Sequence, residues 1–183
     1  RSIWDHFSLE SRTPVTAALA DPVMPGARWF PGTEVNYAAH ALRSEPRGPA
    51  LVGLSQTRGR VELSMEELRD QVARCRAGLA ALGVSRGDRV AAYLPNIPET
   101  VVAFLAAASL GAIWSSCAPE FGTRSVVDRF AQIEPAVLLV VDGYRYGAKT
   151  VDRTEEVAQI RAGLPSVTTT VVVPYLDSAT DRV

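Results

Sequence analysis

Three short apolar runs, separated by longer segments of helical period, dominate the middle of the chain. The runs lie at residues 89–94, 112–116 and 136–141, and each has the length of a buried β-strand. Strands that alternate with helices usually pair in parallel, because a parallel partner needs a crossover connection and a helix supplies it. The pattern therefore predicts an α/β fold with an open, mostly parallel sheet flanked by helices.

The helical segments carry clear start and stop signals. Ser64 and Glu67 form the pattern of a capping box, and Gly83 suits the left-handed position that ends the same helix. Residues 99–110 are apolar on nearly every side, which predicts a helix buried on both sides. Further helices are expected at 36–42, 123–133 and 154–162.

The first 45 residues differ from the rest, because proline and aromatic residues are concentrated there. A short helix is expected at 15–20, ended by Asp21 and Pro22, and a turn with two large rings at 28–32. Later in the chain, strands at 50–55 and 60–64 should form a hairpin, and 168–173 a last strand.

The sequence thus predicts an irregular N-terminal leader at 1–45 and an α/β subdomain at 46–183. The chain starts with Arg1 rather than methionine, and we expect it to be a piece of a longer protein.

Charge and composition narrow the class of partner. Lysine and arginine number 19 against 20 acidic residues, and this balance argues against nucleic acid. No apolar run approaches the roughly 20 residues of a membrane span. Cys75 and Cys117 do not resemble a disulfide framework, and no secretory leader is visible, so a reducing cytoplasm is the expected location.

The segment 143–149 carries the strongest chemical signal. It follows the strand at 136–141, at the carboxyl edge of the predicted sheet, where ligands bind in such folds, and we expect a loop. It resembles a phosphate-binding P-loop only superficially, because its glycines are one residue too close and an alanine separates the second glycine from the lysine. Arg145 and Lys149 could instead hold a phosphate by charge and by a guanidinium fork. A solvated basic turn is the alternative.

Other candidate residues favour structural roles. Cys117 follows a strand, but no histidine is placed to activate it, so we interpret it as a small buried hydrophobe. His6 and His40 have no second ligand or nucleophile at a useful spacing. We therefore predict neither a catalytic residue nor a metal site in this chain.

Several segments, in the same order, resemble the N-terminal part of the acyl-CoA synthetases of the adenylate-forming superfamily. Each is weak alone, but together they span nearly the whole chain. They are Arg28-Trp-Phe-Pro-Gly32, Ser64-Met-Glu-Glu-Leu68, Leu82-Gly-Val-Ser-Arg-Gly-Asp-Arg-Val-Ala91, Leu94-Pro-Asn-Ile-Pro-Glu99, Leu110-Gly-Ala112 and Asp142-Gly-Tyr-Arg-Tyr-Gly147. Within the superfamily, the branch that acts on acetoacetate is favoured by two stretches, Trp114 to Ser116 and Pro119-Glu-Phe-Gly122. The acetyl-CoA synthetases are the branch that the chain resembles next most.

The resemblance implies a two-step ligase. ATP and a carboxylate, here acetoacetate, give an acyl-adenylate and pyrophosphate, and the thiol of CoA then displaces AMP. The Ser/Thr/Gly-rich adenylation loop of these enzymes and their downstream ATP and Mg²⁺ motifs are not found in this sequence. The resemblance therefore places them beyond Val183, in the rest of the same polypeptide, and implies that the chain alone is inactive.

The resemblance also implies a share in CoA binding. In acetyl-CoA synthetases the loop that matches 143–149 carries arginines that bind the 3′-phosphate of CoA, and Arg145 matches the first. The second has no arginine here, and Lys149 falls near it only with a one-residue gap. The loop 117–122 matches a segment lining the CoA nucleotide site. The aromatic found there in acetyl-CoA synthetases aligns with Ala118, so the resemblance does not imply stacking, whereas Phe121 has an aromatic counterpart. The predicted cofactor-binding residues are Arg145, Lys149, Gly143 and Phe121.

Two other interpretations of the residues stay open. One is a stand-alone α/β module that binds CoA or a nucleotide without catalysis, and the other is a purely structural subunit.

Overall fold

The computed structural model describes residues 2–55 and 58–176. Contacts divide the chain into a small unit, Arg1–Ser44, and a larger unit, Glu45–Val183.

The small unit contains two short helices and one antiparallel strand pair: α1 (Ser2–His6), β1 (Leu19–Asp21), β2 (Arg28–Trp29) and α2 (Tyr37–Leu42). The helix predicted at 15–20 is wrong, because Leu19 instead pairs with Trp29. Six residues are too few to sustain a helix without tertiary support. The helix predicted at 36–42 is confirmed, and the side chain of Asn36 caps it by accepting the N–H of Ala39 at 2.9 Å.

Two aromatic rings pack against each other inside the small unit. Trp4 stacks on Phe30 with ring centroids 4.8 Å apart, while Trp29 stays 62% exposed. The turn predicted at 28–32 begins later than expected, since Arg28 and Trp29 belong to β2 and the chain reverses from Phe30, which has a φ of 45°.

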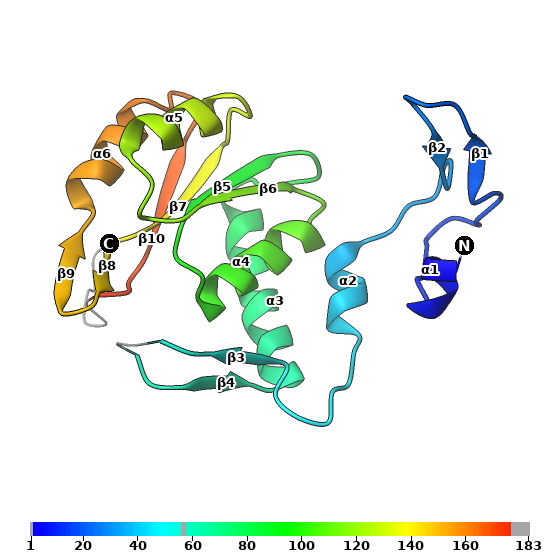
Figure 1. The fold of residues 1–183 in the computed structure, drawn as a ribbon, viewed down its shortest axis with the longest axis horizontal. Helices are drawn as coiled ribbons and strands as arrows, with labels where there is room; N and C mark the ends of the chain where they lie inside the picture. The colour runs from blue at the N-terminus through cyan, green and yellow to red at the C-terminus, as the bar shows by residue number, and fades with distance from the viewer. Residues whose placement is uncertain (1, 56–57, 177–183) are drawn as a thin grey trace. The chain divides into compact units, whose positions relative to one another are not determined.

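The larger unit is built on a four-stranded parallel sheet, as the alternating pattern predicted (Figure 1). The strand order is β10–β7–β5–β6, and Tyr93 of β5 lies in register with both Cys117 of β6 and Val140 of β7. Its elements in chain order are β3 (Leu51–Gly53), β4 (Val61–Leu63), α3 (Met65–Ala81), β5 (Arg89–Tyr93), α4 (Pro98–Ser109), β6 (Ile113–Cys117), α5 (Thr123–Ala131), β7 (Val137–Val141), β8 (Gly143–Tyr146), β9 (Lys149–Asp152), α6 (Thr154–Ala162) and β10 (Thr169–Val173).

Helices cover both faces of this sheet, with α5 and α6 on one side and α3 and α4 on the other (Figure 1). On the first side, Phe130 of α5 and Ile160 of α6 are fully buried against alternate strand residues such as Leu138 and Val140. On the second side, α4 buries Val102, Ala103, Leu105, Ala106 and Ala107. The face of α4 that carries Phe104 is only half-buried, so the expectation of burial on both sides holds in part.

The ends of α3 follow the sequence signals. The Ser64 side chain accepts the N–H of Glu67 at 3.2 Å, and the Glu67 carboxylate accepts the N–H of Ser64 at 2.8 Å. At the other end, Gly83 has a φ of 87°, and the N–H of Val84 reaches back to the carbonyl of Leu79 at 3.0 Å. This arrangement is a Schellman motif, which satisfies the last carbonyls of the helix.

Two antiparallel hairpins flank the sheet, and only one of them was expected. The pair β3–β4 confirms the prediction for 50–64. The prediction of a loop at 143–149 is wrong, because β8 and β9 pair there, joined by a two-residue turn in which Gly147 has a φ of 57°. Aromatic and β-branched residues favour strands, and glycine suits the first position of a tight hairpin turn. The hairpin also excludes a P-loop in this segment.

Candidate functional site at the carboxyl edge of the sheet

The segments that leave β5, β6 and β7 meet at one edge of the sheet. Parallel strands bring their carboxyl ends to the same edge, and ligands bind there in open α/β folds. The turn at 118–122 follows β6, the β8–β9 hairpin follows β7, and α6 begins directly after β9. Two of these connections carry the residues singled out from the sequence: Phe121 lies in the turn after β6, and Gly143, Arg145 and Lys149 lie in the hairpin after β7.

Tyr93, the last residue of β5, fixes the turn that follows β6. Its side chain is fully buried. Its hydroxyl lies 2.6 Å from the carbonyl oxygen of Pro119 and 2.9 Å from that of Phe121, and its single proton is shared between the two acceptors. The register of β5 and β6 explains this placement, because Tyr93 lies beside Cys117, just before the turn.

The same tyrosine is held in its neutral, donating form. Burial raises the pKa of Tyr93 to about 12, and the nearby charge of Arg153 opposes the rise. Acidic groups on Glu156, Tyr144 and Glu120 add to the rise in pKa. Tyr93 therefore acts as a hydrogen-bond donor to the turn over the physiological pH range.

Phe121 lies in this turn with its ring partly open to solvent. The side chain is 43% exposed, and the guanidinium of Arg129 from α5 lies 5.5 Å from the ring centroid. A cation–π contact at an exposed site contributes about 0.5–1 kcal/mol. The turn thus presents an aromatic surface whose backbone is fixed by Tyr93 on the buried side.

Gly143 opens the hairpin at a place where no side chain fits. A Cβ at this position would lie 2.3 Å from the carbonyl oxygen of Val151 and 2.5 Å from the Cδ1 of Leu176. The carboxylate of the preceding Asp142 accepts the N–H groups of Tyr175 and Leu176 at 2.8 and 3.0 Å. Gly143 is buried, so its role here is to permit the close approach at the base of the hairpin.

Arg145 and Lys149 do not lie on the same side of the hairpin. Arg145 pairs with Thr150, and Lys149 pairs with Tyr146. Directly paired residues share a face and successive residues alternate, so the two cations point to opposite faces. Both side chains are exposed, and neither forms an ion pair with any residue in 2–55 or 58–176. The structure does not bring them together as a single phosphate clamp.

Sequence reasoning missed a half-buried arginine at the start of α6. One guanidinium nitrogen of Arg153 lies 2.5 Å from the Glu156 carboxylate, and another donates to the hydroxyl of Tyr144 at 3.1 Å. The side chain is only 15% exposed. Burial alone would lower the pKa of Arg153, but the hydrogen bonds to Tyr144 and Glu156 raise it. The only signal in the sequence was a tyrosine in the 143–149 segment and an arginine before a helix start.

Cys117 is buried, as predicted. Cys75 is half-buried, and desolvation raises the pKa of both thiols. Thiols of this kind are poor nucleophiles at neutral pH. Among the described residues, no three His, Cys, Asp or Glu side chains are grouped so that they could hold a metal ion. No helix in the described part of the chain has the length and apolarity needed to cross a membrane.

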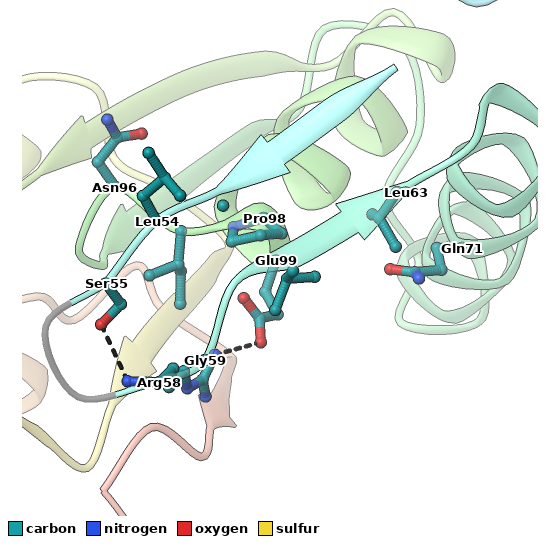
Figure 2. Close-up of a pocket in the computed structure, with 12 residues that line it drawn as sticks. Leu54, Ser55, Arg58, Gly59, Leu63, Gln71, Asn96, Pro98 and Glu99 are labelled. Atoms are coloured by element: carbon teal, nitrogen blue, oxygen red, sulfur yellow. Dashed lines mark hydrogen bonds and ion pairs between the residues drawn. The ribbon is translucent and has the colours of Figure 1, made fainter. Parts of the chain in front are cut away.

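A separate pocket of about 160 Å³ lies between the β3–β4 hairpin and the start of α4 (Figure 2). Its arginine, Arg58, is already engaged: it contacts the Glu99 carboxylate at 2.6 Å and the Pro174 carbonyl at 2.8 Å, and it lies over the Tyr175 ring. None of the four residues predicted from the sequence lines this pocket. The carboxyl edge of the sheet therefore remains the candidate site.

Comparison with known proteins identifies relatives over nearly the whole chain. The model of the family described as "AMP-binding enzyme" matches residues 38–182. The chain is 41% identical to acetoacetyl-coenzyme A synthetase from Rhizobium meliloti (strain 1021), covering 97% of this chain and 27% of the relative. It is 42% identical to acetoacetyl-CoA synthetase from Macaca fascicularis, covering 82% of this chain and 23% of the relative.

A solved structure agrees with these sequence matches. The structure of acetoacetyl-CoA synthetase from Streptomyces lividans matches 98% of this chain with a TM-score of 0.92 and 49% identity. The match covers 28% of that protein. The chain thus spans about a quarter of the length of the relatives that it matches.

Proposed function

Because the chain belongs to the AMP-binding enzyme family, we propose that it is the N-terminal part of an ATP-dependent acetoacetate–CoA ligase. The reaction joins acetoacetate to CoA in two steps. ATP and acetoacetate give acetoacetyl-adenylate and pyrophosphate, and the CoA thiol then displaces AMP to give acetoacetyl-CoA. The observation that carries this proposal is the similarity to the acetoacetyl-CoA synthetase of S. lividans over nearly the whole chain.

This chain's own share is the binding of CoA. Arg145 is an exposed guanidinium at the carboxyl edge of the sheet, without a partner in the part of the chain that the structure describes, and its planar fork suits a phosphate oxygen pair. Phe121 offers a ring surface at the same edge for the nucleotide. Lys149 faces the other side of the hairpin, so in this proposal it supports binding through its charge, while Gly143 shapes the hairpin base.

ATP and Mg²⁺ belong in this proposal to the rest of the polypeptide. Magnesium is usually held by one or two carboxylates together with waters and substrate phosphates, and in this proposal that part supplies them. No residue of this chain is assigned to ATP or Mg²⁺. The proposed partners are small molecules and the remainder of the same protein.

We further propose a cytoplasmic location. Cys75 and Cys117 are free thiols in the same unit, which suits a reducing compartment.

The ligase proposal is tested with the full-length protein. Purified enzyme is given ATP, Mg²⁺ and CoA with either acetoacetate or acetate, and the release of AMP is followed. We expect acetoacetate to give the higher kcat/KM. Absence of AMP release with acetoacetate, in a folded preparation, would overturn the proposal.

The CoA role of the hairpin is tested by Arg145→Ala and Lys149→Ala in the full-length enzyme. Loss of one hydrogen-bonded charge on a phosphate costs about 1.5–3 kcal/mol, so Arg145→Ala should raise the KM for CoA roughly 10- to 150-fold. Lys149→Ala should raise it less. The exchange of pyrophosphate into ATP, which needs no CoA, should stay near the parent value in both variants. Equal damage to both half-reactions would refute the assignment.

The alternative function is a stand-alone α/β module that binds CoA or a nucleotide without catalysis. The mass of the native protein distinguishes the two. A mass several times 19.7 kDa supports the ligase, and a mass near 19.7 kDa supports the module.

A further inference from the structure

Arg153 ties together three elements at the carboxyl edge of the sheet. Its backbone N–H donates to the carbonyl of Asp142, just after β7, at 2.9 Å. Its guanidinium donates to Tyr144 on β8 and contacts Glu156 on α6. The guanidinium also lies 5.2 Å from the centroid of the Tyr144 ring, so one side chain holds both the hydroxyl and the ring of Tyr144.

The hairpin has few other supports of its own. Its strands pair chiefly with each other, and isolated two-stranded hairpins are only marginally stable in water. The base is anchored by Asp142 and by the close approach at Gly143. Beyond the base, Tyr146 is 77% exposed, and Gly147 and Ala148 at the turn are exposed as well. The contact between Arg153 and Tyr144 is therefore a support that lies between the fixed base and the exposed tip.

Anchoring Tyr144 determines where the next side chain points. Successive residues of a strand project to opposite faces, so Tyr144 held toward the start of α6 sends Arg145 to the other face. The register, with Tyr144 opposite Val151 and Arg145 opposite Thr150, keeps this arrangement along β8 and β9. Both Tyr144 and Val151 are half-buried, whereas Arg145 and Thr150 are exposed.

We propose that Arg153 is a positioning residue that holds the β8–β9 hairpin against α6 and thereby places Arg145 for CoA. This inference rests on the proposed function, because it assumes that Arg145 contacts CoA. Arg153 itself touches neither substrate nor cofactor in this scheme. Arg153 limits the motion of the hairpin before CoA binds. The binding of CoA then has to order less of the hairpin, which lowers the entropy cost of binding.

The test uses the full-length enzyme and five variants. Arg153→Ala removes both side-chain contacts, and Arg153→Lys keeps the charge but loses the fork that reaches two partners. Tyr144→Phe removes only the hydroxyl and keeps the ring. Arg145→Ala reports on the CoA contact itself. Arg161→Ala is the matched control, because Arg161 is an exposed arginine in the last turn of the same helix with no side-chain partner among the described residues.

Two readouts separate positioning from general structural damage. Arg153→Ala should raise the KM for CoA about tenfold, the effect of one charge-assisted hydrogen bond, and leave ATP–pyrophosphate exchange within about twofold. Hydrogen exchange of peptides covering 143–152 should become faster, while peptides covering β5 and α4 stay unchanged. Arg153→Lys should recover little of the loss, and Tyr144→Phe should show a smaller rise in KM. Arg161→Ala should match the parent enzyme.

The possible failures are distinguishable. If Arg145→Ala leaves the KM for CoA unchanged, the proposed role of the hairpin in CoA binding is wrong. The proposal that Arg153 positions Arg145 for CoA is then wrong as well. If Arg145→Ala raises this KM but Arg153→Ala does not, the positioning role of Arg153 falls and the CoA role stands. If Arg153→Ala slows both half-reactions equally and speeds exchange across the whole sheet, Arg153 supports the fold in general, which also overturns the proposal.

Discussion

Replacing Tyr93 with phenylalanine should weaken the fold by an amount that the structure allows us to estimate. The change keeps the buried ring and removes only the hydroxyl that the carbonyls of Pro119 and Phe121 share. The bond to Pro119 is buried, whereas the one to Phe121 is only partly buried, so water can replace the hydroxyl at Phe121. One buried acceptor left without a donor costs about 1–3 kcal/mol, which is the expected loss in the free energy of unfolding at neutral pH.

The same substitution should change how stability depends on pH. The pKa of Tyr93 is raised from 10.0 to about 12 in the folded protein, chiefly by burial. A raised pKa contributes stability that is fully present below the unfolded value and lost as the pH rises through the folded value. The parent chain should therefore lose roughly 1 kcal/mol from this group by pH 11 and roughly 3 kcal/mol in full. The Tyr93→Phe variant has no such loss.

Urea unfolding of the two chains, followed by far-ultraviolet circular dichroism at several pH values from 7 to 11, measures both effects. Other ionisations contribute equally to the two chains and cancel in the difference. The parent should be the more stable at pH 7, and the gap should narrow above pH 10. Equal free energies of unfolding for the two chains at pH 7 would show that the hydrogen bonds from the hydroxyl to the two carbonyls do not stabilise the fold. A gap that stays constant up to pH 11 would show that the hydroxyl is not protected from ionisation.

Three further predictions concern other parts of the chain. Gly143→Ala would place a methyl group against the carbonyl of Val151 and the side chain of Leu176, so hydrogen exchange of the hairpin should become faster and the KM for CoA of the full-length enzyme should rise. Ser64→Ala removes the acceptor at the start of α3 and should lower the free energy of unfolding in urea by about 1 kcal/mol. The isolated 183-residue chain should show no acetoacetate-dependent ATP–pyrophosphate exchange, and any turnover would contradict the assignment of ATP binding to the rest of the protein.

The central sheet could be predicted because each of its elements carries its own local signal. The strand ending at Tyr93 is apolar after Arg89, and α3 shows a capping box, an apolar stripe and a terminal glycine within 20 residues of sequence. These signals reflect burial and the satisfaction of helix ends, which depend on neighbours a few positions away. They can therefore be recognised in a single sequence without knowledge of the tertiary structure.

The β8–β9 hairpin was missed because its residues suggested chemistry more strongly than structure. Two tyrosines, an arginine and a lysine near glycines resemble a ligand loop, although the same residues alternate with the period of a strand. Missing the hairpin also led to a wrong expectation about the candidate site. Once β8 and β9 are paired in the observed register, Arg145 and Lys149 lie on opposite faces, which no reading of a flexible loop could reveal.

The anchors of the site could not be predicted for a different reason. The partners of Tyr93 are backbone carbonyls 26 and 28 residues further along the chain, and any residue can supply a carbonyl. Arg153 likewise meets Tyr144 only because the hairpin folds back on the start of α6. Interactions of this kind depend on the register of the sheet and on the path of the connections. The exposed candidates Arg145 and Phe121 were visible in the sequence, but the residues that hold their segments were not.

The two anchors interact electrostatically, and the sign of this interaction matters for the positioning test. Arg153 lowers the pKa of Tyr93, so replacing Arg153 with alanine would raise that pKa further above its ordinary value. Tyr93 would then remain neutral at physiological pH and would still donate to the turn at 118–122. A weaker binding of CoA in Arg153→Ala therefore cannot come from ionisation of Tyr93. The lost contacts to Tyr144 and Glu156 remain as the cause, and hydrogen exchange distinguishes loosening of the hairpin that carries Arg145 from loosening of the whole sheet.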